Sequence, residues 1–305
     1  MATFNNSIDQ KICNKVTEKL VALIESGVNP WRKPWTGGAN GDAAISHTTG
    51  KAYSLLNQIL LGFRPGEYLT FNQVKAAGGS VKKGAKSGLI VFWCTGYEKT
   101  VTETDEDGNE TSKKVFAQYS RPLLKSYNVF HIDDCTGITP NYNKESVNTP
   151  SYDFQKDTAA EELAQSYVNR SGVSLSIQSS DRAFYRPSTD SVVVPLREQF
   201  ANPAEFYSTL FHELTHSTGH SSRLNRFAEN SGVAACKKEY SREELVAEIG
   251  AAAVLSYLGI NTDESDANSA AYLQGWGSYL KSDPKAFIIA AGKAEKAFNM
   301  ILGNN

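Results

Sequence analysis

Apolar residues recur at helical spacing in three segments of the first half of the chain. Between residues 7 and 27 every fourth position from Ile8 onward is apolar, which predicts an amphipathic helix that ends before Pro30. Shorter helical patterns follow at 53–61 and 71–77.

Extended segments follow in the expected place. The continuous apolar run 89–93 predicts a buried strand. Two alternating arms, 97–102 and 114–119, flank an acidic tip and predict a β-hairpin, and a further strand is expected over 122–132. Residues 1–136 are therefore predicted to form an α+β domain with a mostly antiparallel sheet.

The composition changes in the middle of the chain. Residues 137–157 are dominated by Gly, Pro, Asn, Ser and Thr, which predicts a linker. A helix is expected next, at 159–170, and then two strands, 184–187 and 191–195, around a Ser-Thr-Asp turn. We therefore expect a second domain over residues 158–305.

The following helix has a well-marked beginning. Asn202-Pro203 places a capping residue before a proline at the first helical position, and Glu205 stands at the third position. One face of this helix is apolar, while His212 and His216 share its period but lie about 200° away. The apolar positions are Phe206, Leu210 and Leu214.

The stretch His212-Glu213-Leu214-Thr215-His216 has the H-E-x-x-H pattern of zinc-dependent peptidases. Residues four apart lie on one helix face, so His212 and His216 can bind one tetrahedral Zn²⁺, or another divalent metal. Glu213 can then take the proton of a water molecule at the metal. The alternative is a helix with two solvated histidines and no metal.

A catalytic zinc needs a third protein ligand. The spacing to Ser222 excludes the metzincin pattern, which requires histidine there, and we interpret His220 as a neighbouring or surface residue. Glu244 and Glu248 lie four apart on a later helix and could provide one ligand and one carboxylate that orients a histidine. Ser241 and Glu244 also match a capping box, in which case Glu248 would be the ligand.

These residues predict peptide hydrolysis with Glu213 as the general base. The group that stabilises the oxyanion could be Tyr185 or Tyr240. We expect residues 192–194 to form an edge strand that pairs with an extended peptide substrate.

Composition limits the class of protein and the cellular compartment that can be expected. Apolar residues make up 40% of the 305 residues and charged residues 21%, as in ordinary globular proteins. No run of about 18 apolar residues occurs, so no membrane-spanning helix is expected. The first residues do not resemble a signal peptide, and the four cysteines form no CxxC pair, which favours a reducing cytoplasm.

Charge is divided unevenly. Residues 1–130 contain 16 basic and 11 acidic side chains, a balance of +5, and residues 131–305 contain 15 and 22, a balance of −7. Five of the acids in the first part lie between positions 103 and 110. Lys82, Lys83 and Lys86 stand among small residues, where a backbone turn and cations can approach phosphate. An anionic partner or a merely solvated basic surface both fit this pattern.

A second candidate for nucleic-acid contact is the segment from Asn29 to Trp35. Arg32 and Lys33 stand between Trp31 and Trp35, a combination that can stack bases and neutralise phosphate. The alternative is that each tryptophan fixes a loop to the protein core.

Together these stretches resemble the ArdC-type antirestriction proteins of conjugative plasmids and related mobile elements. The similarity covers nearly the whole chain and is carried by NPWRKPW, YLTFNQVKAAGGSVKKGAKSGLIVFW, SYNVFHIDDCTGI, HELTHSTGHSSRLNR and EELVAEIGAA. The resemblance implies an N-terminal domain that binds single-stranded DNA without sequence preference and a C-terminal zincin-like metallopeptidase domain. It also implies protection of incoming DNA from host restriction.

The second domain is also similar to the ImmA/IrrE-type group, whose third metal ligand is a glutamate. The matching residue is Glu244, while Glu248 stands where that group has asparagine. The expected function is therefore an antirestriction protein that binds single-stranded DNA and cleaves a protein substrate. Two alternatives are a DNA-binding protector with a structural metal, and a cytosolic peptidase or toxin without a DNA role.

Overall fold

The computed structural model describes residues 7–26, 28–31, 43–104, 110–142, 157–200, 202–227, 237–260 and 270–304. The helices are α1 (Ser7–Glu25), α2 (Leu55–Leu60), α3 (Phe71–Ala76), α4 (Thr158–Ser171), α5 (Pro203–Ser217), α6 (Lys237–Leu258), α7 (Ala270–Ser282) and α8 (Ala286–Leu302). The strands are β1 (Ala44–Ser46), β2 (Gly66–Thr70), β3 (Ser80–Val81), β4 (Gly88–Thr104), β5 (Glu110–His131), β6 (Cys135–Thr136), β7 (Ser174–Gln178), β8 (Phe184–Arg186) and β9 (Ser191–Pro195).

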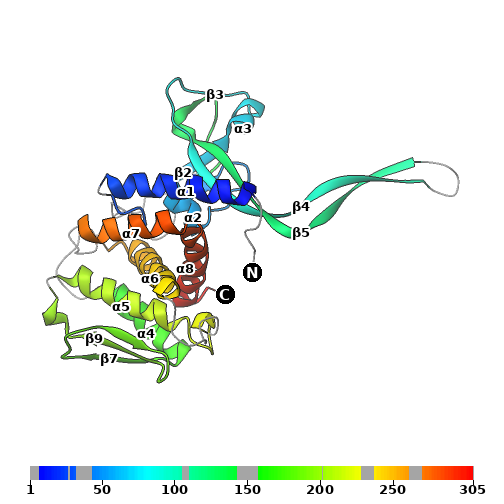
Figure 1. Cartoon of the computed structure of the whole chain (residues 1–305). Coiled ribbons are helices and arrows are strands. Elements are labelled where there is room, and N and C mark those ends of the chain that lie inside the picture. Colours follow the sequence, from blue (N-terminus) through cyan, green and yellow to red (C-terminus); the bar gives the residue numbers. More distant parts are fainter. Residues whose placement is uncertain are drawn as a thin grey trace.

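The elements form three layers along the molecule. The sheet of the N-terminal part lies at one end, the sheet of the C-terminal part lies at the other, and helices α1, α6, α7 and α8 lie between them (Figure 1). The predicted α+β class is confirmed. Among the described residues, no helix combines the length and the apolar character needed to cross a bilayer.

The N-terminal sheet has the strand order β1-β2-β5-β4. Strand β2 pairs in parallel with β1 and antiparallel with β5, and β5 pairs antiparallel with β4. The mostly antiparallel arrangement is thus confirmed. The strand at 89–93 and the first hairpin arm are one continuous strand, β4, and the second arm continues into the strand at 122–132 as β5.

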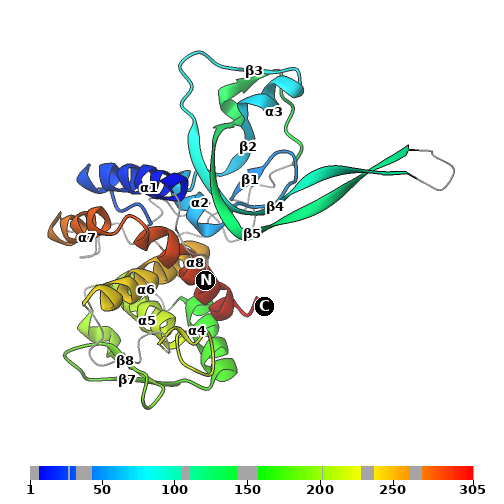
Figure 2. The ribbon, with the colours of Figure 1, turned by 45° about the vertical axis from the view of Figure 1, so that its right-hand side comes forward.

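The two long strands form a ribbon that projects far from the body (Figures 1 and 2). Their register shifts between Cys94 and Gly96, which marks an irregularity near the point where the ribbon leaves the body. Before this point, Trp93 and Leu124 are paired and both contact the large central core cluster. The ribbon is therefore anchored at its base by apolar packing.

The central cluster joins both ends of the sequence. It combines buried residues of α1, α2, β4 and β5 with those of α6, α7 and α8. Trp31 is 1% exposed and its ring lies 5.6 Å from that of Phe287 and 6.0 Å from that of Trp276. Trp31 therefore fixes its loop to the core and cannot stack on a base. The boundaries expected at 1–136, 137–157 and 158–305 stay a prediction.

The C-terminal sheet has the order β7-β9-β8, with β7 parallel and β8 antiparallel to β9. Strand β7 was not expected from the sequence, and its presence corrects the prediction for residues 192–194. These residues belong to β9, the central strand, in which Val192 and Val194 are fully buried. A continuous apolar run is typical of a strand enclosed on both sides. The edge strand beside α5 is β8.

Candidate metal centre

Helix α5 carries the two histidines on a firmly anchored scaffold. The side chain of Asn202 accepts a hydrogen bond of 2.9 Å from the backbone N–H of Glu205, as the capping pattern predicts. The apolar face, with Phe206, Leu210 and Leu214, is buried in the C-terminal core cluster. The opposite face is thereby turned toward α6.

His212, His216 and Glu244 meet at this face. The two histidine Nε2 atoms lie 3.1 Å apart, and Glu244 carboxylate oxygens lie 3.4 Å from Nε2 of His212 and 3.6 Å from Nε2 of His216. One ligand atom from each residue lies within 4.8 Å of the others. Tetrahedral ligands at zinc bond lengths stand about 3.3 Å apart. The spacing and the donor set therefore fit one tetrahedral divalent cation.

Close contact between α5 and α6 makes this meeting possible. A Cβ atom at Gly250 on α6 would lie 2.6 Å from Cγ2 of Thr215 on α5, so any larger residue would force the helices apart. The side chains of His212 and Glu244 remain 19% and 26% exposed. The cluster is thus rigidly held but reachable from solvent.

The capping alternative for Glu244 is wrong. Helix α6 begins at Lys237, so Ser241 lies inside the helix rather than at its N-cap. Glu248 approaches the other ring nitrogen of His212, with 3.5 Å between its Oε1 and Nδ1. Glu244 therefore faces the Nε2 atoms of both histidines, whereas Glu248 lies beside Nδ1 of His212.

A third carboxylate, Glu243, was missed by the sequence interpretation. Its Oε1 lies 3.4 Å from Nδ1 of His216 and accepts a hydrogen bond of 2.6 Å from Arg226. Arg226 also donates to the hydroxyl of Thr218 and to the carbonyl of Thr215, at 2.7 and 2.9 Å. A signal was present, because Arg226 closes the HSTGHSSRLNR run.

The electrostatics of the cluster match a cation site. Burial acts to raise the pKa of Glu244, but hydrogen bonds to His212 and His216 lower it well below its usual range. Burial acts against protonation of His216, but hydrogen bonds to Glu243 and Glu244 raise its pKa to about 9. Glu243 and Glu244 thus favour the protonated, positively charged form of His216. A bound cation would take the place of that proton.

Glu213 lies beside this cluster, only 8% exposed. Burial raises the pKa of Glu213, while the neighbouring His212 and His216 lower it. The backbone of Tyr185 on β8 also lies close enough to lower the pKa of this carboxylate. The edge strand, the carboxylate and the histidines are therefore neighbours.

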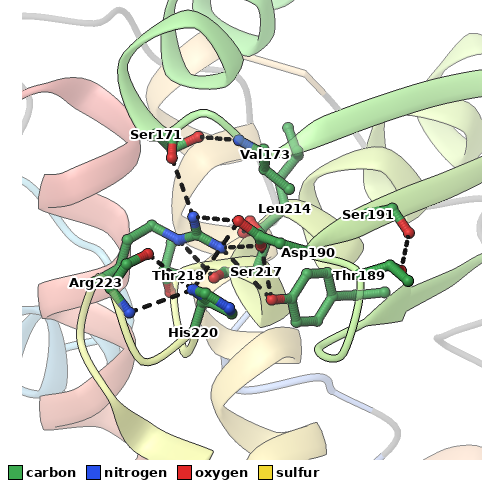
Figure 3. A network of polar contacts seen from close by, with 12 residues as sticks. Ser171, Val173, Thr189, Asp190, Ser191, Leu214, Ser217, Thr218, His220 and Arg223 are labelled. Carbon is green, nitrogen blue, oxygen red and sulfur yellow. Dashed lines mark hydrogen bonds and ion pairs between the residues drawn. The ribbon is translucent and has the colours of Figure 1, made fainter.

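A polar network fixes the β8–β9 turn to the segment after α5 (Figure 3). Arg223 makes a two-pronged ion pair with Asp190 and donates to the carbonyls of Ser217 and Ser171, at 2.8 and 3.1 Å. The hydroxyl of Tyr185 donates to Asp190 at 2.9 Å.

This network bears on the prediction that Tyr185 or Tyr240 stabilises the oxyanion. Because the Tyr185 hydroxyl already donates to Asp190, and burial raises its pKa, it is committed to the network rather than to the histidines. The side chain of Tyr240 lies outside the described residues. His220 accepts a hydrogen bond of 3.2 Å from the backbone of Ser222 and is not part of the histidine cluster.

The residues predicted to contact nucleic acid lie far from the metal centre. Lys82, Lys83 and Lys86 are exposed between β3 and β4, at the opposite end of the molecule from α5 (Figures 1 and 2). Lys82 donates to the carbonyl of Asp133 at 2.7 Å. The prediction for Arg32 and Lys33 falls outside the described residues.

The fold and the histidine cluster define a zincin-like domain joined to a second α+β region. Residues 162–293 match the family described as zincin-like metallopeptidase, and residues 10–130 match the N-terminal domain of anti-restriction factor ArdC. The structure is similar to that of the antirestriction ArdC protein from the R388 plasmid. For the metal-free form the TM-score is 0.65 at 32% identity, with 96% of this chain and 97% of the other covered. The chain belongs to the ArdC family of antirestriction proteins.

Two further comparisons refine this picture. The Mn(II)-bound structure of the same R388 protein gives a TM-score of 0.67 at 31% identity, covering 96% of this chain and 97% of the other. A protein named DNA primase TraC from Escherichia coli is 35% identical over 94% of this chain. The chain spans only 27% of the length of that relative.

Proposed function

We propose that this chain is a cytoplasmic antirestriction protein of a mobile element, which binds single-stranded DNA through its N-terminal region and hydrolyses peptide bonds at the histidine cluster. The observation that carries the proposal is the convergence of His212, His216 and Glu244 beside the buried carboxylate of Glu213. A structural metal site has no need of a buried general base next to its ligands.

His212, His216 and Glu244 would hold the metal, with Glu248 and Glu243 orienting the two imidazole rings. Two imidazoles and one carboxylate suit Zn²⁺, and the Mn(II)-bound relative supports other divalent ions as well. When bound, such an ion polarises a peptide carbonyl and lowers the pKa of a water molecule.

The protein's own residues would carry out the proton transfers. Glu213 accepts the proton of the attacking water at its carboxylate and delivers it to the leaving nitrogen. Its burial raises its pKa, which favours the protonated state required for the second step. The free edge of β8 would hold the peptide as an added strand across the site.

The DNA-binding part rests on the match of residues 10–130 to the ArdC N-terminal domain and on the excess of basic residues in that region. Lys82, Lys83 and Lys86 provide exposed cations on one loop. The name of the TraC relative also connects this sequence with DNA.

A Glu213→Gln variant tests the enzymatic part. We expect it to keep its metal and its affinity for single-stranded DNA, because both depend on other residues, but to lose peptidase activity by about 100-fold or more. It should also lose protection of incoming plasmid DNA in a restricting host. Glu162→Gln, which changes an exposed carboxylate on α4, is the matched control.

Full protection by the Glu213→Gln variant would contradict the proposal and favour a non-enzymatic protector. Absence of binding to single-stranded DNA by the unmodified protein would instead favour a peptidase without a DNA role. Fluorescence anisotropy with labelled oligonucleotides at several salt concentrations measures that binding.

A further inference from the structure

The β4–β5 ribbon exposes aromatic rings that nothing in the described structure covers. Phe92, Tyr97, Phe116 and Tyr127 are 41%, 49%, 63% and 42% exposed. Such rings are normally buried, because each one removes a large apolar area from water when it is covered. Their presence on one projecting element indicates a binding surface.

The rings are arranged in groups rather than scattered. Phe92 and Tyr127 are stacked, with centroids 5.2 Å apart and planes inclined by 18°. Further along the ribbon, Tyr97 and Tyr119 lie 5.3 Å apart at 33°. Each group presents an extended π-surface across the two strands, which is the kind of platform on which a base can stack.

At the base of the ribbon this surface lies on the face of the sheet opposite the central core cluster. Trp93 and Leu124 form a cross-strand pair that contacts the central core cluster. Because side chains alternate along a strand, the neighbouring pair of Phe92 and Lys125 lies on the opposite face, whose Ile90 and Val129 are buried in a small apolar cluster closer to the body. Tyr127 is two residues further on and shares that face.

The same strands are rich in cations. Strands β4 and β5 contain five basic side chains and three acids. One of the acids, Glu98, makes an exposed ion pair of 3.6 Å with Lys114. The other acids of this hairpin stand at positions 103–110. The basic residues are Lys99, Lys113, Lys114, Arg121 and Lys125.

This combination identifies the occupant. These rings alternate along the strands with lysine, threonine and serine, so they do not form the contiguous apolar patch that marks many protein interfaces. Bases offer flat faces to the rings, and phosphates offer negative charge to the cations. A double helix keeps its bases stacked inside, so only an unpaired strand can use the rings.

We propose that the β4–β5 ribbon is the main surface for single-stranded DNA, with bases stacked on Phe92 and Tyr127 and on Tyr97 and Tyr119, and phosphates beside the lysines. This inference rests on the proposed DNA binding and locates it on the ribbon rather than on the loop at residues 82–86.

The test measures the affinity for a labelled oligothymidylate across a salt series. The double substitution Phe92→Ala and Tyr127→Ala should weaken binding roughly five- to hundredfold while leaving the salt dependence unchanged, because it removes stacking and not charge. Lys99→Ala with Lys113→Ala should instead reduce the slope of log K against log salt, by about 0.7 for each phosphate that a lysine no longer neutralises.

Two matched variants complete the experiment. Phe71→Ala removes an equally exposed ring from α3, at 47% exposure, and should leave affinity unchanged. Tyr97→Ala with Tyr119→Ala removes the second pair of rings, further along the ribbon, so it tests stacking even if the double variant at the base is unstable. Thermal unfolding curves establish that each variant is folded.

If the unmodified protein binds the oligonucleotide and every ribbon variant binds it with the same affinity as the unmodified protein, the ribbon is not the site, and the inference is wrong. Loss of binding only in a Lys82, Lys83 and Lys86 triple-alanine variant would assign the site to that loop. A change in oligomeric state without a change in DNA affinity would make the ribbon a protein interface. If the unmodified protein itself fails to bind, the proposed DNA function fails, not merely its location.

Discussion

The metal centre and the ribbon place chemically active residues in opposite environments. At the metal centre, His216 and Glu243 are each 12% exposed and lie on two helices that pack closely together. On the ribbon, Phe116 is 63% exposed on a strand that projects into solvent. One region fixes its side chains by packing and hydrogen bonds, and the other leaves them open.

The difference follows from what each region has to recognise. A metal and a reacting carbonyl require ligand atoms placed to within about 0.5 Å, so the supporting residues must be locked. A single strand without sequence preference offers many equivalent bases, so rings on an accessible surface suffice. Changes at the metal centre should therefore be costly and local, and changes on the ribbon should affect binding but not folding.

The largest effect is expected from removing a ligand. His216→Ala should reduce the metal content from one ion per chain to nearly none, because a catalytic zinc site needs three protein ligands and only two would remain. Metal analysis of the purified protein measures this content. His220→Ala removes a histidine four residues away, outside the cluster, and should retain the ion. Equal metal content in both variants would show that the ion binds elsewhere.

The next effect concerns the support of the metal centre. Arg226→Ala removes the guanidinium that pairs with the carboxylate of Glu243. The pair is buried, since the side chains of Arg226 and Glu243 are only 4% and 12% exposed. Removing one partner of a buried pair costs about 3–5 kcal/mol of unfolding free energy. Lys281→Ala breaks an exposed pair with Glu25 and should cost less than about 1 kcal/mol. Urea denaturation of the metal-free proteins compares the two, and equal losses would contradict the distinction.

A smaller effect is expected from acid. The hydrogen bond from Arg223 holds the pKa of Asp190 below its ordinary value of 3.8. Its contribution to stability is therefore complete above that value and is lost as pH falls through the lower pKa of the folded state. Asp190→Asn should cost about 1.5–3 kcal/mol at neutral pH and flatten the acid limb of the stability curve. Unfolding free energies measured from neutral pH downward test this, and an unchanged acid limb would exclude Asp190 as its source.

The smallest effect on folding is expected on the ribbon. Phe116→Ala removes a ring that is mostly exposed, so the unfolding free energy should change by no more than about 0.5 kcal/mol. Its metal content should remain that of the unmodified protein. A loss of several kcal/mol would mean that the ring packs in a way that its exposure does not indicate, and would weaken the contrast between the two regions.

Local patterns predicted much of the fold. The helix from Pro203 to Ser217, its Asn202 cap and the two histidines on one face follow from the spacing of residues a few positions apart. The helix at Thr158–Ser171 and the strands around the turn before Ser191 were also correct. These features depend on neighbours in sequence, so sequence alone contains them.

Errors arose where distant segments meet. The run Val192–Val194 alone predicts an edge strand, because nothing in its own sequence reveals that β7 pairs with its other side. The capping box expected at Ser241 and Glu244 is absent, because α6 already begins at Lys237. Trp31 could be either a stacking or a core residue until its contact with Phe287 was known.

The sequence by itself determined the chemistry that is available: two histidines and a glutamate at helical spacing, candidate carboxylates on a later helix, and an excess of basic residues in the first part. Only the tertiary structure decided how these groups are used. It brought Glu244 to both histidines, paired Glu243 with Arg226, placed β8 at an edge of the sheet next to α5 and left the ribbon's rings exposed. The physical reason is that helical periodicity is a local property, whereas contacts between elements depend on how the whole chain buries its apolar surface.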